Sequence, residues 1–313
     1  HDQSSAASDV YKRQVFVIAY AFVMAEEFTH LRKSKPVVLA AGLIWGMIAI
    51  AYSNTPHYEM VEHEIRHSFL EYTELAFFLL VAMTYINALE ERNVFNSLKS
   101  WLIKNQFSYR QLFWITGVLA FFLSPLADNL TTALVLCAVV VAVGSSSPKF
   151  VGLACVNIVV AANAGGAFSP FGDITTLMVW QAGQLDFLQF FALVIPSVVN
   201  YIIPASIMHF FVSDHKPDVA ETSVTIKYGG KTIILLGLLT IVTAVSFHNF
   251  LHLPPVFGMM TGLAYLQLYS FYIKISVKDI EEHKYDFFEN VARVEWDTLL
   301  FFFGVILSVG GLG

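Results

Sequence analysis

Long apolar runs separated by short polar segments dominate the pattern of this chain. Spanning a bilayer takes roughly 17–25 apolar residues in a helix. Runs of about that length, the first of them shorter, occupy residues 15–28, 36–52, 69–89, 150–180, 187–212, 232–247, 255–272 and 298–312. The pattern therefore predicts an all-α polytopic membrane protein.

Two further apolar stretches, 112–123 and 130–143, are too short to cross comfortably. They flank the polar break at 124–129, which contains Pro125 and Asp128. We expect a re-entrant hairpin over 109–143 that enters and leaves on one side. Residues 94–103 form an amphipathic segment that we expect on the cytoplasmic surface.

The distribution of Lys and Arg tests this topology, because cytoplasmic loops carry an excess of both. If 109–143 returns to its own side, every Lys and Arg after residue 14 except Arg66 falls in a cytoplasmic loop. An odd number of crossings by 109–143 would invert the second half of the chain and destroy this agreement. The charges therefore favour a hairpin or an even number of crossings.

The composition agrees with a lipid environment. Of the 313 residues, 56% are hydrophobic and 13% charged, whereas soluble domains average about 25% charged residues. The net charge of −6 and the lack of a dense basic cluster exclude nucleic-acid binding. Cys137 and Cys155 both lie in apolar runs, so we interpret them as buried small hydrophobes.

Both ends of the sequence look unnatural. Residues 1–14 are polar and lack the apolar core of a signal peptide, so we interpret them as a non-native or disordered leader. The chain stops inside an apolar run. We expect a fragment with a first transmembrane repeat at 15–212, a cytoplasmic linker at 213–231 and a truncated second repeat at 232–313.

Two internal matches suggest this repeat organisation. The pattern Ser-Pro-x-x-Asp-x-x-Thr at 124–131 recurs at 169–176, where we expect a broken helix over 150–183. The pattern Glu-aromatic-x-x-Leu-x-Phe-Phe occurs at 71–78 and at 295–302. By the charge distribution the latter two helices run in opposite directions, as an inverted repeat requires. Counterparts of Asp128 and Asp173 would fall beyond Gly313.

Asp128 and Asp173 are the strongest candidates for chemistry. A carboxylate at membrane depth costs roughly 2.5–3.5 kcal/mol on insertion scales and persists where it faces a cavity, a partner or an ion. Both lie beside Ser-Pro breaks, where carbonyls, amides and hydroxyls suit a hard cation. The surrounding set is Asn129, Thr131, Thr132, Asn163, Ser169, Thr175 and Thr176, together with Gly165 and Gly166, which would let the backbone approach an ion closely. The alternative interpretation makes both aspartates helix N-caps in connecting loops.

Glu71 and Glu74 open the third apolar run, and Glu74 lies about one turn into it. Glu74 is a candidate for a proton or cation relay, whereas the alternative is a first-turn carboxylate that complements the helix dipole. Residues 63–67 match the zincin pattern His-Glu-x-x-His. We do not interpret them as a zinc site, because the segment belongs to an external loop and no third ligand follows.

The strings at 124–134 (SPLADNLTTAL) and 163–180 (NAGGAFSPFGDITTLMVW) resemble the NhaD-type sodium/proton antiporters of the ion transporter superfamily. The stretch at 74–85 fits the same pattern. The resemblance implies exchange of Na⁺ or Li⁺ for H⁺ and a fold of two inverted repeats with hairpins and broken helices. It also implies that Asp128, Asn129, Asn163, Asp173, Thr175, Thr176 and Glu74 are functional, with Na⁺ at Asp128, Asp173 and Asn163.

The mechanism that follows is competition. A desolvated carboxyl group binds a proton more readily, so one site exposed alternately to each side could carry H⁺ or Na⁺. No cofactor is expected, and the partners are the bilayer, the transported ions and a second copy in a homodimer. The rivals are a dicarboxylate or arsenite carrier and an intramembrane aspartyl protease. A bacterial inner membrane is favoured, with a plastid envelope as the alternative.

Overall fold

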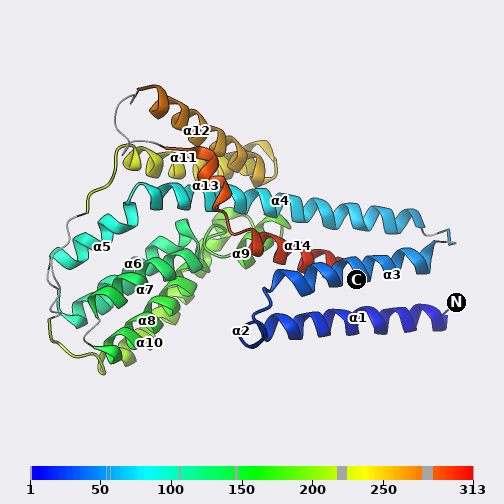
Figure 1. Cartoon of the computed structure of the whole chain (residues 1–313), viewed down its shortest axis with the longest axis horizontal. Helices are drawn as coiled ribbons and strands as arrows, with labels where there is room; N and C mark the ends of the chain where they lie inside the picture. Colours follow the sequence, from blue (N-terminus) through cyan, green and yellow to red (C-terminus); the bar gives the residue numbers. More distant parts are fainter. Residues whose placement is uncertain are drawn as a thin grey trace. The chain divides into compact units, whose positions relative to one another are not determined.

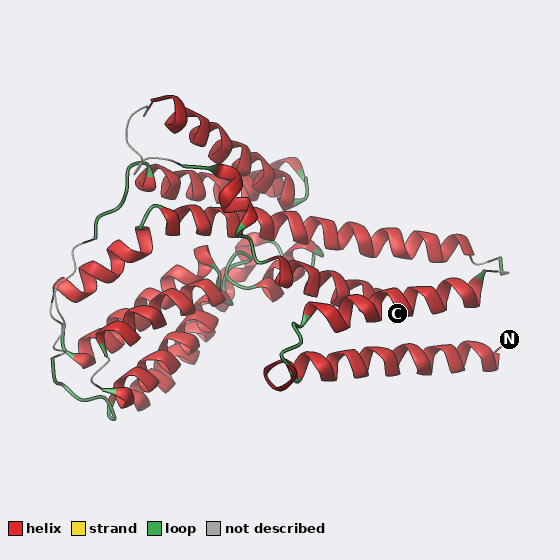
Figure 2. Cartoon of the chain, in the orientation of Figure 1, coloured by secondary structure: helices red, strands yellow, loops and turns green. Residues whose placement is uncertain are grey.

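The computed structural model describes residues 2–53, 55–56, 58–105, 107–144, 147–216, 224–276 and 285–312. Within these ranges the chain is helical and contains no strand (Figure 2), which confirms the all-α class. The elements (Figure 1) are α1 Asp2–Met24, α2 Glu26–Thr29, α3 Ser34–Tyr52, α4 Tyr58–Glu91, α5 Val94–Lys104, α6 Tyr109–Ala127, α7 Asn129–Val143, α8 Pro148–Gly166, α9 Ile174–Gln181, the 3₁₀ helix η1 Phe187–Leu193, α10 Val194–His209, α11 Gly230–Leu251, α12 Pro255–Ser276, α13 Phe287–Ala292 and α14 Trp296–Gly310.

The polytopic character is confirmed. Among the described residues, seven helical segments are long and apolar enough to cross a membrane, namely α3, α4, α6, α8, η1 together with α10, α11 and α12. Helices α7 and α14 are apolar but shorter, with 15 residues each. Part of the predicted linker, residues 217–223, lies outside the described residues.

The chain forms two compact units. The first contains residues 1–83 and 292–313, and the second contains residues 84–291. In the first unit α14 packs on α3, where Gly304 lies against the backbone of Val37 and the indole N–H of Trp45 donates to the carbonyl oxygen of Leu307 at 2.8 Å. Phe303 of α14 meets Tyr72 of α4 edge to face at 5.0 Å. The two segments of the predicted long-range repeat therefore lie in one unit.

The second unit contains the hairpin. Helices α6 and α7 meet at Asp128 and pack against each other and on α8, which also contacts α10. Helices α6 and α7 thus form a helical hairpin, and its re-entrant course in the membrane stays a prediction. Its first arm is longer than expected, because the helix begins at the capping box of Ser108 and Gln111 and continues through Pro125. At 19 residues, α6 is long enough to cross, so the expectation that this stretch is too short was wrong.

Helix α4 corrects a second expectation. It begins at Tyr58 and extends for 34 residues without Gly or Pro, so segment 63–67 is helical rather than a loop. Glu71 and Glu74 lie well inside this helix. The first-turn interpretation of both is wrong, because the helix dipole acts within the terminal turn. The Nδ1 atom of His67 lies 3.6 Å from a carboxylate oxygen of Glu71, on an exposed face.

Residues 2–14 also differ from expectation. They continue the helix of the following apolar run instead of forming a disordered leader. The segment has no Pro or Gly that would end a helix.

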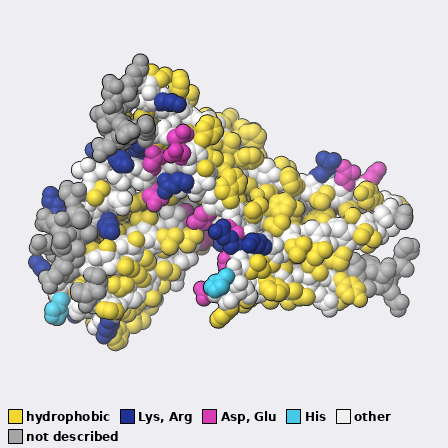
Figure 3. Space-filling model, viewed as in Figure 1, with side chains coloured by type: hydrophobic (Ala, Val, Ile, Leu, Met, Phe, Trp, Pro, Cys, Tyr) yellow, Lys and Arg dark blue, Asp and Glu magenta, His cyan; other side chains and the backbone are white. Residues whose placement is uncertain are grey.

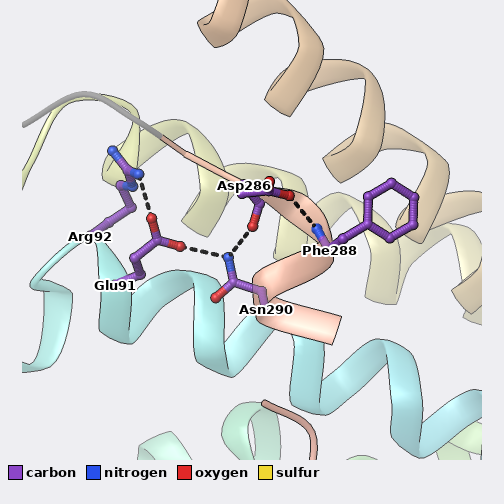
Figure 4. A network of polar contacts seen from close by, with 5 residues as sticks. All are labelled: Glu91, Arg92, Asp286, Phe288 and Asn290. Carbon is purple, nitrogen blue, oxygen red and sulfur yellow. Dashed lines mark hydrogen bonds and ion pairs between the residues drawn. The ribbon is translucent and has the colours of Figure 1, made fainter. Parts of the chain in front are cut away.

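A polar network fixes the end of α4 to α13 within the second unit (Figure 4). The amide of Asn290 donates to a carboxylate oxygen of Glu91 at 2.6 Å and to the carbonyl oxygen of Asp286 at 3.1 Å. The other oxygen of Glu91 accepts from the guanidinium of Arg92, which is 1% exposed and lies 4.8 Å from the ring centre of Tyr285. Burial raises the pKa of the Tyr285 hydroxyl above its usual range.

Candidate functional site

Two helix breaks of the second unit come together. The first is the joint between α6 and α7 at Asp128, and the second is the loop 167–173 between α8 and α9. The hydroxyl of Ser124 donates to the carbonyl oxygen of Ala162 at 2.6 Å, and the hydroxyl of Ser169 donates to that of Pro125 at 3.0 Å. Each serine of the repeated motif therefore hydrogen-bonds its own break to the segment that contains the other break.

Glycines allow this close approach. A Cβ on Gly165 would lie 2.1 Å from the carbonyl oxygen of Phe121, and one on Gly166 would lie 2.6 Å from that of Gly172. Both obstacles are backbone atoms, which side-chain motion cannot relieve. Sequence reasoning assigned Gly165 and Gly166 to contact with an ion, and it missed that they first bring the two breaks together. The Gly-Gly pair beside an apolar helix was the available signal.

Asp128 ends α6 and caps α7. Its Oδ1 accepts from the backbone N–H of Thr131 and its Oδ2 from the hydroxyl of Thr131, both at 2.8 Å. Its backbone has φ 54° and ψ 160°, a region that is essentially reserved for glycine and that costs about 1–3 kcal/mol for other residues. Such strain persists where the surroundings demand it, and it clusters at functional sites.

Asp173 caps α9 from ordinary extended backbone, with φ −149°. Its Oδ1 accepts from the backbone N–H of Thr175 at 2.8 Å and from the hydroxyl of the same residue at 2.7 Å. Its Oδ2 accepts from the side-chain amide of Asn129. The capping interpretation of both aspartates is thus confirmed, and the second carboxylate has a further, non-local contact.

Asn129 links the two breaks through its side chain. Its Nδ2 contacts Asp173 Oδ2 at 2.5 Å and Asn163 Oδ1 at 3.1 Å. Asn163 in turn donates to the carbonyl oxygen of Val159 at 2.8 Å, which orients its amide oxygen toward Asn129. Three of the predicted polar residues, from α7, α8 and the loop before α9, therefore converge on one point.

The remaining predicted residues surround this point or lie apart from it. Thr176 donates to the carbonyl oxygens of Ser169 and Asp173 at 2.8 and 2.7 Å, which holds the loop before α9. The Thr132 hydroxyl is buried on α7 with no hydrogen-bond partner among the described residues. Asn163 and Thr175 are exposed, so the cluster is open on one side. Glu74 belongs to the first unit.

The two breaks together carry two carboxylates, two side-chain amides and several hydroxyls. Such oxygen-rich sets suit hard cations. The described residues contain no group of three or more His, Cys, Asp or Glu side chains that could hold a metal ion. The zincin-like segment 63–67 therefore gains no third ligand from the described residues.

The arrangement differs from the carboxylate pair of an aspartyl protease. In that dyad two carboxyl groups share one proton at close contact. Here the side-chain amide of Asn129 donates to Oδ2 of Asp173, and both carboxylate oxygens of Asp128 accept hydrogen bonds from Thr131. The hydrogen bonds thus give each aspartate its own partners.

Comparisons with known proteins agree on the class of the chain. Residues 13–313 match the sequence model of the citrate transporter family. The Na⁺/H⁺ antiporter NhaD of Vibrio cholerae is 53% identical over 95% of this chain and 67% of its own length. NhaD of Alkalimonas amylolytica is 52% identical over 96% of this chain and 66% of its own length. Sodium/proton antiporter 1 of Arabidopsis thaliana is 31% identical over the whole chain and 54% of its own length. The chain thus spans about two thirds of the length of the bacterial relatives.

Proposed function

The chain belongs to the NhaD family of sodium/proton antiporters, within the citrate transporter family, and from that premise we propose that it exchanges Na⁺ or Li⁺ for H⁺ across a membrane. The exchange takes place at Asp128 and Asp173. The family consists of secondary transporters that need no bound cofactor, so the chain is a carrier rather than an enzyme.

One observation carries the assignment of the site. Asn129, which directly follows Asp128, donates to Asp173 and lies within hydrogen-bond distance of Asn163. The residue that follows the carboxylate of the first helix break is thereby hydrogen-bonded to the carboxylate of the second. A hydrogen bond from an amide to a carboxylate also orients the carboxylate without adding charge.

The mechanism is competition between ions at the carboxylates. Withdrawal from water favours the protonated form of a carboxyl group, and neutral oxygen ligands favour Na⁺ once the proton leaves. Asp128 and Asp173 exchange the ions, and the side chains of Asn129, Asn163, Thr131, Thr132, Ser169, Thr175 and Thr176 supply ligands or position them. Alternate exposure of one such site to the two sides produces antiport rather than leak.

An anion carrier fits the cluster less well. The N-termini of α7 and α9 would attract an anion, but Asp128 and Asp173 already cap them through backbone N–H groups. A substrate carboxylate would meet two negative side chains at that point. The cluster therefore favours cations over a dicarboxylate or arsenite.

Further proposals rest on the same family membership. We propose that Glu74, inside the long helix α4, relays protons or cations toward the protein core. We also propose that residues 15–212 and 232–313 belong to two inverted repeats, and that the protein forms a homodimer in a bacterial plasma membrane, with a plastid envelope as the alternative.

Vesicle transport measurements test the proposal. Asp128→Asn and Asp173→Asn should each reduce Na⁺-driven proton flux to background in everted vesicles from cells that lack other antiporters. Asp186→Asn is the matched control, because Asp186 also caps a helix of the second unit but lies outside the cluster. Wild-type flux in both cluster variants would overturn the assignment. Flux driven by citrate or arsenite instead of Na⁺ would overturn the choice of substrate.

A further inference from the structure

The two cysteines of the chain meet between α7 and α8, inside the second unit. The thiol of Cys137 donates to the carbonyl oxygen of Cys155 at 4.0 Å, and the two thiols lie close enough to interact with each other. Both residues are half-buried and neither forms a disulfide. They are therefore more accessible than the buried small hydrophobes that the sequence suggests. The chain contains no third cysteine, so any chemistry of paired thiols in it belongs to this site.

The thiols are the middle of three contacts along α7 and α8, which pack side by side (Figure 1). Where α7 ends, a Cβ on Gly144 would lie 2.7 Å from the side chain of Val151. Where α7 begins, Asn129 contacts Asn163 of α8 at 3.1 Å. Each cysteine lies eight residues from the asparagine of its own helix, which is about 12 Å along the helix axis. The thiol pair is therefore separate from the carboxylates but belongs to two of the helices that hold them.

The surface beside the thiols is apolar. Leu134 and Val141 lie one turn before and after Cys137 and are 59% and 53% exposed. Val159 lies one turn after Cys155 and is 44% exposed. Figure 3 shows mostly hydrophobic side chains on the visible face of the α6, α7, α8 and α10 region. A neutral metal complex can therefore approach the thiols through an apolar medium, whereas a hydrated ion would lose its water at a cost.

The ligands select the class of metal. Thiolates are soft ligands and prefer soft ions such as Cu⁺, whereas the oxygen-rich cluster at the helix breaks suits hard cations. Structural zinc sites use four ligands, and the described residues contain no group of three or more His, Cys, Asp or Glu side chains that could hold a metal ion. Two sulfur atoms from facing helices instead suit soft ions that bind two thiolates in a line, such as Hg²⁺ and Cu⁺.

We propose that Cys137 and Cys155 together bind one soft, two-coordinate metal ion of the class of Hg²⁺ and Cu⁺. Both thiols lose their protons, and the metal forms one bond to each sulfur. One ion thus displaces two protons without any change of oxidation state. The bridge joins α7 to α8 at mid-length and restricts the movement of Asn129 against Asn163 at the ends of the same helices. This consequence for transport rests on the proposed function, whereas the binding of the metal does not.

The experiment titrates the purified full chain in neutral detergent with mercuric chloride and follows the ultraviolet absorbance of mercury–thiolate bonds. The wild type should reach its plateau at one Hg²⁺ per chain, whereas two independent thiols would bind two. Cys137→Ser and Cys155→Ser are matched variants that keep one thiol each. Glutathione should remove mercury from either variant at concentrations about hundredfold lower than from the wild type, because two linked ligands act at a high effective concentration. Mercury should also raise the Tm of the wild type alone.

Two results of the titration would overturn the site: a plateau at two Hg²⁺ per chain in the wild type, or removal by the same glutathione concentration from the wild type and both variants. Should one serine variant fail to fold, the other provides the same comparison.

Transport by the purified chain in liposomes tests the consequence. Inhibition of Na⁺-driven proton flux by mercury should resist glutathione in the wild type and be reversed by it in both serine variants. Unchanged flux in the mercury-loaded wild type would refute the restriction of α7 against α8. Absence of flux before any mercury is added would count against the proposed function instead, and the titration in detergent would still decide the metal site.

Discussion

The two helix breaks share a sequence motif but differ in construction. At the first, one residue, Asp128, separates two helices and adopts φ 54°. At the second, a seven-residue loop separates α8 from α9, and Asp173 has φ −149°. Both aspartates cap a helix through a threonine, yet only Asp173 receives the amide of Asn129. The same motif therefore forms a strained joint at Asp128 and an unstrained loop at Asp173, whose carboxylate is hydrogen-bonded to a side chain from the other break.

This difference suggests that the two breaks have different structural roles. The strained joint is held by packing of α6 against α8, whereas the carboxylate of the relaxed loop is oriented by Thr175 within the loop and by Asn129 from the opposite break. The first break then sets the geometry, and the second is the more adjustable partner.

The largest effect should come from separating the breaks. Gly165→Ala would place a methyl group 2.1 Å from the carbonyl oxygen of Phe121. Backbone must move, and we expect a loss of several kcal/mol in stability, at or above the usual ~1–3 kcal/mol of overpacking. The measurement is the Tm of the purified protein. Gly152→Ala on the same helix is the control, because its Cβ would meet nothing within 4 Å. Equal Tm values for the two variants would show that the close approach is unimportant.

The next effect should come from removing the bridge. Asn129→Ala deletes the contacts with Asp173 and Asn163 and leaves the caps intact. Hydrogen bonds to charged groups contribute about 1.5–3 kcal/mol, so the apparent Na⁺ affinity in vesicles should fall about tenfold to hundredfold. Asn96→Ala, which removes an exposed amide that contacts only Asn93 among the described bonds, should retain wild-type affinity. If both variants behave alike, Asp173 does not depend on the opposite break.

A third effect should distinguish the two backbones directly. At Asp128, glycine relieves strain, so Asp128→Gly should be more stable than Asp128→Ala by about 1–3 kcal/mol. At Asp173 the backbone is ordinary, so glycine keeps only its better N-capping, and its advantage over alanine should fall below about 1 kcal/mol. Thermal unfolding of the four variants measures both differences. An equal advantage of glycine at both sites would refute the claim that only the first joint is strained.

The sequence predicted this region well where the signal was local. Pro and Asp interrupting apolar runs gave both breaks, the N-caps and the polar set, and periodicity with the charge distribution gave the hairpin. The sequence did not predict those helix ends that depend on more than hydropathy. Helix α4 extends through polar residues such as Glu62 and Arg66, which pair at 2.7 Å one turn apart, and α6 gains length from its capping box.

Non-local features could not be derived from the sequence. The bond from Ser124 to Ala162 and the bridge from Asn129 to Asp173 join residues 38 and 44 positions apart. Such contacts depend on how α6 packs on α8, and no local pattern encodes that register. The positive φ of Asp128 is also unpredicted, because aspartate usually caps helices from extended backbone.

The smallest expected effect comes from removing the threonine hydroxyl that contacts each capping aspartate. Thr131 contacts both oxygens of Asp128, whereas Thr175 contacts only Oδ1 of Asp173, whose other oxygen has Asn129. Thr131→Val should therefore weaken apparent Na⁺ affinity about threefold, within the ~0.5–1.5 kcal/mol of one hydrogen bond, and Thr175→Val should weaken it less. Serine at either position keeps the hydroxyl and should restore wild-type transport. A larger loss of Na⁺ affinity in Thr175→Val than in Thr131→Val would contradict this prediction. It would show that Asp173, rather than Asp128, depends more on the threonine of its own cap.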